Sequence, residues 1–109
     1  MSPLAFFLQR GTALLLAPLV LVHLGLIIYA VRGGLSANEI LARTQGSTGW
    51  GLFYALFVLA VSVHAGIGLR NVLDEATGLP RGASAALAHL FMLLLLVLGL
   101  RAVYAVVIA

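Results

Sequence analysis

The chain has 109 residues, of which 63% are hydrophobic and only 8% are charged, and its formal net charge is +3. A soluble domain typically carries about 25% charged residues, so this composition excludes an ordinary water-exposed surface and predicts a protein surrounded by lipid. The absence of cysteine excludes disulfides, thiolate metal sites and thioether-linked haem. The cations, all Arg, do not cluster, so no nucleic-acid binding is predicted. The length predicts a single domain, 1–109.

Charged residues divide the chain into three uncharged runs, 11–31, 44–69 and 82–100. About 20 apolar residues suffice for a helix to cross ~30 Å of hydrocarbon, whereas barrel strands would alternate polar with apolar residues. We therefore predict an all-α integral membrane protein with three transmembrane helices. Their predicted bounds are about 11–32, 50–72 and 84–107.

The first predicted helix has a longer apolar run than the roughly 7–15 residues of a cleaved signal peptide, so we expect it to span the membrane. Pro18 should kink it or free a carbonyl near Leu14. In the polar segment that follows, Ser36 and Glu39 have capping-box spacing. This spacing predicts one or two turns of helix at the membrane surface.

Aromatic residues are expected at one membrane interface, because indole and phenol rings prefer the headgroup layer. These residues are Tyr29, Trp50, Tyr54 and Tyr104. Arg101 interrupts the third predicted helix and is expected to extend toward the interface. The six Arg divide equally between the two ends of the predicted bundle, so the positive-inside rule leaves the orientation open.

Each predicted helix contains one histidine: His23, His64 and His89. An ionisable side chain inside a bilayer is costly and indicates function, and neutral imidazole is the usual protein ligand for haem iron. At a rise of about 1.5 Å per residue, His64 and His89 share a layer near the N-terminal side, and His23 lies deeper. The alternative is that such a histidine packs between helices and hydrogen-bonds a carbonyl.

Small residues surround His64 and favour it as the haem ligand. Ala60 and Gly68 lie one turn before and after it, and Gly66 is close by, so a porphyrin could approach the helix. The competing interpretation is close helix packing by small residues. The second ring nitrogen of His64 is expected to donate to a backbone carbonyl one turn earlier.

Charged residues gather on the N-terminal side, where the first predicted helix begins and the second one ends. They are Arg10, Arg70, Asp74 and Glu75. The simplest interpretation is an i,i+4 ion pair between Arg70 and Asp74. The functional interpretation is a site for a lipid-soluble molecule with carbonyl or hydroxyl groups. Arg10 would polarise a carbonyl oxygen there while an acid relays protons.

The segment 64–75 resembles a motif of the membrane-anchor, cytochrome b subunits of succinate dehydrogenase and fumarate reductase. In that motif a His is followed by three residues, Gly, one residue and Arg, with an acid a few residues later. The matching residues are His64, Gly68, Arg70 and Glu75 or Asp74. Residues 8–12 resemble the family's Arg-x-Thr start of the first helix. The chain departs from the family at Phe6, where the large anchor usually has Ser, and at Ala76, where the small one often has Tyr.

The resemblance implies a non-catalytic subunit that anchors a flavoprotein and an iron–sulfur subunit to the bacterial inner membrane, with its N-terminus in the cytoplasm. It implies that His64 ligates the iron of a b-type haem, opposite a His of a second anchor subunit or a second copy of this chain. His89 is the secondary haem candidate. Arg10, Arg70, Gly68, Asp74 and Glu75 are implied to lie near a haem propionate or the head group of ubiquinone or menaquinone.

Such a subunit would pass electrons between iron–sulfur clusters and quinone, in the respiratory chain and the tricarboxylic acid cycle. Three alternatives remain: a haem-free anchor of the same kind of complex, a small transporter or channel subunit, and an assembly factor. The sequence leaves open the direction of electron flow, the number of haems and the role of His23.

Overall fold

The computed structural model describes residues 2–109 and is helical almost throughout. The helices in chain order are α1 (Pro3–Gly33), α2 (Ala37–Thr44), α3 (Thr48–Ala76) and α4 (Arg81–Val103), followed by a π-helical turn, η1 (Tyr104–Ile108). Three helices are long and apolar enough to cross a membrane: α1, α3, and α4 together with η1. The predicted all-α fold with three spanning helices is confirmed.

The first helix begins at Pro3 rather than near residue 11. The side chain of Ser2 accepts a hydrogen bond from the backbone N–H of Ala5 at 3.1 Å, and Pro3 takes the first helical position. Ser is a preferred N-cap, and Pro fits the first turn because its missing N–H would have no helical partner there. Arg10 therefore marks the edge of the uncharged run 11–31 and not the start of the helix.

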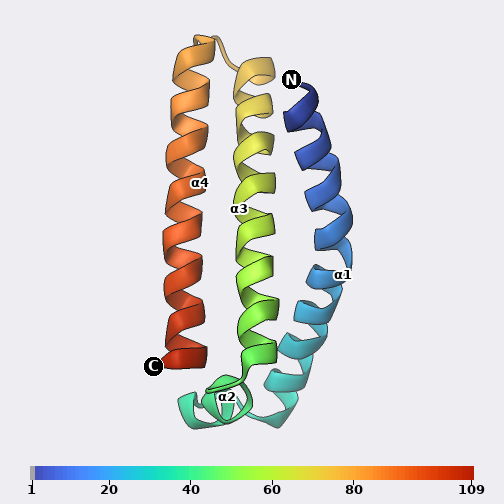
Figure 1. Ribbon diagram of the computed structural model, residues 1–109, viewed down its shortest axis with the longest axis vertical. Helices are drawn as coiled ribbons and strands as arrows, with labels where there is room; N and C mark the ends of the chain where they lie inside the picture. The colour runs from blue at the N-terminus through green and yellow to red at the C-terminus, as the bar shows by residue number, and fades with distance from the viewer. Residues whose placement is uncertain (1) are drawn as a thin grey trace.

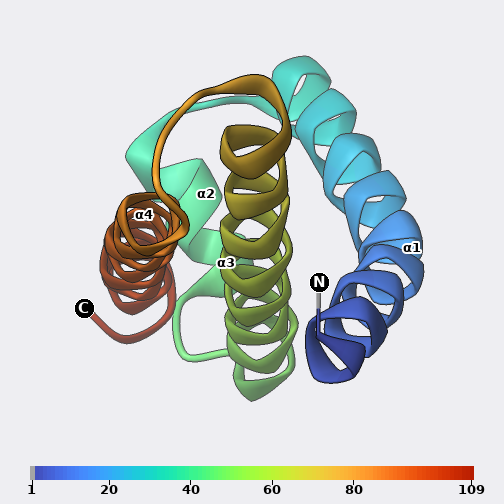
Figure 2. The ribbon, with the colours of Figure 1, turned by 90° about the horizontal axis from the view of Figure 1, so that it is seen from above.

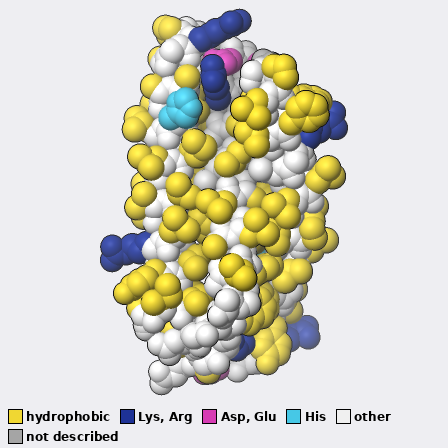
Figure 3. All heavy atoms as spheres, in the orientation of Figure 1, with side chains coloured by type: hydrophobic (Ala, Val, Ile, Leu, Met, Phe, Trp, Pro, Cys, Tyr) yellow, Lys and Arg dark blue, Asp and Glu magenta, His cyan; other side chains and the backbone are white. Residues whose placement is uncertain are grey.

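The three long helices lie side by side, with α3 between α1 and α4 (Figures 1 and 2). The molecule measures 47 × 24 × 23 Å. Because the helices form a layer and not a closed bundle, most large apolar side chains are exposed on its faces. Figure 3 shows apolar side chains over much of one face, with basic side chains mainly toward the two ends. This distribution suits a protein embedded in lipid.

Small residues bring α3 and α4 close together. A Cβ on Gly66 would lie 3.0 Å from Cβ of Met92, and a Cβ on Gly99 would lie 2.5 Å from Cγ1 of Val58. The most deeply buried residues of this interface are Ala60, Ser62, Ser84 and Ala88. Close approach of this kind is typical of membrane helices, where packing replaces the hydrophobic driving force.

The short helix α2 lies across the end of the molecule opposite the N-terminus (Figure 1). Ser36 caps it by accepting from the backbone N–H of Glu39 at 3.2 Å, which confirms the predicted surface helix. Thr44 Oγ1 donates to the carbonyl of Val106 at 2.6 Å, and the backbone N–H of Gly46 donates to Val107 at 2.7 Å. These bonds fasten α2 to the C-terminal turn.

The predicted interfacial aromatic residues lie at this same end. Trp50 stacks on Tyr54 with ring centroids 5.9 Å apart, and the Arg43 guanidinium lies 5.3 Å from the ring centre of Tyr29. The helix α1 continues through Pro18, and Figure 1 shows it bowed, as expected where proline removes a backbone N–H.

Candidate functional site

His64 lies on the face of α3 that packs against α1. Its Nδ1 is 3.2 Å from the hydroxyl oxygen of Thr12. The same hydroxyl lies 2.6 Å from the carbonyl oxygen of Leu8. The prediction that this ring nitrogen bonds a carbonyl one turn earlier on the same helix is therefore wrong. The ring points across the α1–α3 interface, and its hydrogen-bond partner lies on α1.

The small residues beside His64 are occupied by neighbouring helices. Gly66 faces Met92 of α4, and a Cβ on Gly68 would lie 3.3 Å from Nε2 of Gln9 on α1. These contacts confirm close helix packing for Gly66 and Gly68, whereas porphyrin binding beside His64 stays a prediction. The imidazole of His64 is nevertheless only partly buried. Among residues 2–109 no group hydrogen-bonds its Nε2.

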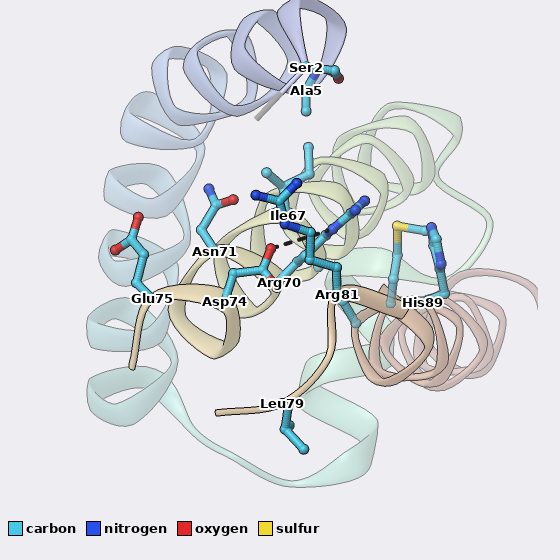
Figure 4. A pocket seen from close by; sticks show the side chains of 13 residues that line it. Ser2, Ala5, Ile67, Arg70, Asn71, Asp74, Glu75, Leu79, Arg81 and His89 are labelled. Atoms are coloured by element: carbon cyan, nitrogen blue, oxygen red, sulfur yellow. Dashed lines mark hydrogen bonds and ion pairs between the residues drawn. The ribbon is translucent and has the colours of Figure 1, made fainter. Parts of the chain in front are cut away.

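A cavity of about 790 Å³ opens at the N-terminal end of the helix layer. Figure 4 shows it lined by side chains from α1, α3 and α4. Its ionisable lining residues are Arg70, Asp74, Glu75, Arg81 and His89. The apolar part includes Ile67 and Met92. The cavity thus combines charged groups at the membrane end with apolar walls toward the membrane interior.

The ion pair predicted between Arg70 and Asp74 is present, with Nε and Oδ2 3.9 Å apart. Arg81 reaches across to the same place, whereas Glu75 lies to one side (Figure 4). The sequence interpretation missed Arg81. Its position at the start of α4, directly after the turn from the end of α3 that carries Asp74, was the signal that could have found it.

The other residues that the sequence predicted for the site do not lie together in the structure. Arg10 does not line the cavity; it is exposed, with its guanidinium 5.2 Å from the ring centre of Phe6. His64 and Gly68 lie at the α1–α3 interface, and His89 lies on α4, across α3 from α1. His64 and His89 therefore do not face one another as a pair of ligands within one chain.

His23 packs among aromatic rings near the α2 end. Its ring centre lies 5.1 Å from that of Phe57 and 6.3 Å from that of Tyr54, both nearly perpendicular. It also borders a smaller cavity of about 240 Å³. Within residues 2–109 no three His, Asp or Glu side chains gather as a metal site.

Comparisons with known proteins agree with the architecture. The sequence model of the family described as "Succinate dehydrogenase/Fumarate reductase transmembrane subunit" matches residues 3–104. The chain is also 34% identical, over 108 residues, to the succinate dehydrogenase hydrophobic membrane anchor subunit of Archaeoglobus fulgidus, covering 97% of this chain and 92% of the relative. No solved structure matches it. The chain therefore belongs to the succinate dehydrogenase/fumarate reductase transmembrane subunit family, and it is a multi-pass membrane anchor.

Proposed function

We propose that this chain anchors a flavoprotein and an iron–sulfur subunit to the membrane and contributes to a quinone site through which they exchange electrons. The observation that carries this proposal is the charged cavity of about 790 Å³ at one membrane end of α3 and α4. It lies where a molecule dissolved in lipid could meet a soluble partner. The family and the printed name of the archaeal relative support the anchoring role.

The cavity lining suits a quinone head group, whether ubiquinone or menaquinone. Arg70 and Arg81 can donate hydrogen bonds to a carbonyl oxygen and stabilise negative charge that develops on it. Asp74 and Glu75 can relay protons from water. Met92 can contact the apolar ring. Arg10 points outside the cavity, so we assign it to the contact with a partner subunit.

His64 is the residue that would ligate the iron of a b-type haem. The ring is partly buried in the spanning part of α3, and Thr12 contacts Nδ1. No group among residues 2–109 hydrogen-bonds Nε2, so this nitrogen could bind iron. Bound haem would supply a one-electron carrier between iron–sulfur clusters and quinone. Because His89 lies on α4 and His64 contacts α1, a second histidine for the iron would come from a second anchor subunit or a second copy of this chain.

We assign the N-terminal end to the cytoplasmic side of the bacterial inner membrane. The cavity and its two acids lie at this end. Electrons can enter there from soluble subunits, and protons can enter from water.

The haem assignment is tested on the complex purified in mild detergent, with the pyridine haemochrome spectrum as the measurement. We expect His64→Ala to abolish the b-type absorption band. His23→Ala is the matched control, because His23 is also an intramembrane histidine but packs among aromatic rings. A His64→Ala complex with a full b-type band would contradict the assignment, and a wild-type complex without haem would favour a haem-free anchor.

The quinone assignment is tested separately with Arg81→Gln. We expect the KM for quinone to rise about tenfold or more, because a hydrogen bond from a charged donor contributes roughly 1.5–3 kcal/mol. Succinate oxidation with a soluble dye acceptor should not change. An unchanged quinone KM would remove Arg81 from the site.

A further inference from the structure

We infer that Thr12 is a positioning residue that fixes the proton of His64 on Nδ1 and leaves the Nε2 lone pair free as the metal-binding atom. This inference rests on the proposed role of His64 in binding haem iron. It concerns a contact between two helices, with Thr12 on α1 and His64 on α3.

The hydrogen-bond distances assign the protons. A threonine hydroxyl has one hydrogen to donate and two lone pairs that accept. Thr12 Oγ1 is 2.6 Å from the carbonyl oxygen of Leu8 but 3.2 Å from Nδ1 of His64. A carbonyl can only accept, so the Thr12 hydrogen goes to Leu8. The hydroxyl oxygen then accepts from His64, whose Nδ1 must carry the hydrogen.

The opposite arrangement is unfavourable. If Thr12 donated to an unprotonated Nδ1, two oxygens would face each other at 2.6 Å without a hydrogen between them. The carbonyl of Gln9, 3.2 Å from the hydroxyl, is a poorer second acceptor on the same side. The α1 backbone therefore selects the tautomer of a histidine on α3.

The selected tautomer is the one that binds a metal through Nε2. A hydrogen bond from the other ring nitrogen also orients the ring and makes the ligand more basic. The competing explanation is that Thr12 only bonds back to its own helix, as threonines in membrane helices commonly do. On that explanation, the His64 tautomer would not depend on Thr12.

The first test measures the tautomer directly, by NMR of the full chain with ¹⁵N-labelled histidine in micelles without haem. The signals of His64 are those missing from His64→Asn. We expect the Nδ1–H tautomer in the wild type and in Thr12→Ser, and a shift toward Nε2–H in Thr12→Val. Thr44→Val, which loses a hydroxyl at the other membrane end, should keep the wild-type tautomer. Nε2–H in the wild type, or no change in Thr12→Val, would overturn the inference.

The second test uses the haem-containing complex. We expect Thr12→Val to weaken haem binding about 10- to 100-fold, as is usual when the hydrogen-bond partner of a metal-binding histidine is lost. It should also raise the haem midpoint potential, and Thr12→Ser should restore both. Wild-type haem affinity and potential in Thr12→Val would overturn the inference. A wild-type complex without haem would instead contradict the proposed function, while the NMR test of Thr12 would still stand.

Discussion

The two faces of α3 differ in chemistry. Toward α4, glycines and small side chains allow close contact, as where Gly99 meets Val58. Toward α1, longer polar side chains meet, and Thr12 bonds His64. Helices in lipid associate through packing and hydrogen bonds. We infer that the glycine contacts between α3 and α4 mainly supply stability, whereas the contact of His64 with α1 and the cavity at the N-terminal end carry the chemistry.

The largest effect on stability is expected where α3 and α4 approach each other most closely, at Gly99. Gly99→Ala places a methyl group 2.5 Å from Cγ1 of Val58, so either the Val58 side chain or the helices must shift. Overpacking of this kind costs about 1–3 kcal/mol. The free energy of unfolding, measured by SDS titration in mixed micelles, should fall accordingly.

Two further variants make the Gly99 prediction specific. Gly25→Ala is the control, because a Cβ there meets open space, and it should not destabilise. Adding Val58→Ala to Gly99→Ala should recover part of the lost stability by removing the methyl groups in conflict. If the two substitutions simply added, Gly99 would not be in tight contact with Val58.

A second comparison places the same substitution on the two faces of one helix. Gly66→Ala brings Cβ within 3.0 Å of Cβ of Met92, next to the backbone of α4, whereas Gly68→Ala meets the far end of the Gln9 side chain at 3.3 Å. Both gain up to about 1 kcal/mol of helix propensity. We expect Gly66→Ala to be less stable than Gly68→Ala by about 1 kcal/mol in the same titration. Equal stabilities would contradict the difference between the two faces.

Most of the fold could be predicted from the sequence, because its signals are strong and local. Runs of apolar residues gave the three spans, and Ser36 with Glu39 gave the surface helix. The helix starts were less accurate, as at Pro3, since charge marks the membrane boundary while capping decides where a helix begins.

The candidate site was only partly predictable, because it depends on how helices rotate against one another. The spacing of Arg70 and Asp74 gave their ion pair directly. Spacing could not show that Gly66 and Gly68 face different helices, nor that Arg10 points away from the cavity. The link between Thr12 and His64 joins residues far apart in the sequence, and no local pattern reveals it.

The short helix α2 is hydrogen-bonded to the C-terminal turn that follows α4. This bond should contribute less to the free energy of unfolding than the glycine contacts do. Thr44→Val removes the donor to the Val106 carbonyl and should lower the free energy of unfolding by about 0.5–1.5 kcal/mol, the usual net contribution of one hydrogen bond. Thr48→Val is the control, since Thr48 is exposed at the start of α3. If both variants matched the wild type in SDS titration, the bond would not stabilise the α2 end.

The smallest effect on stability is expected in the charged cavity. The Arg70–Asp74 pair is 3.9 Å long and both side chains are substantially exposed, at 48% and 31%. Such pairs contribute about 0–1 kcal/mol, so Asp74→Asn should change unfolding by less than about 1 kcal/mol. Quinone-linked turnover of the complex should nevertheless fall, because an amide cannot relay a proton.

Glu75→Gln is the matched comparison: Glu75 lies to one side of the cluster (Figure 4), so its loss should reduce turnover less. If Asp74→Asn destabilised the chain strongly but left turnover intact, the charges would serve folding, and the assignment of chemistry to this end of the layer would be wrong.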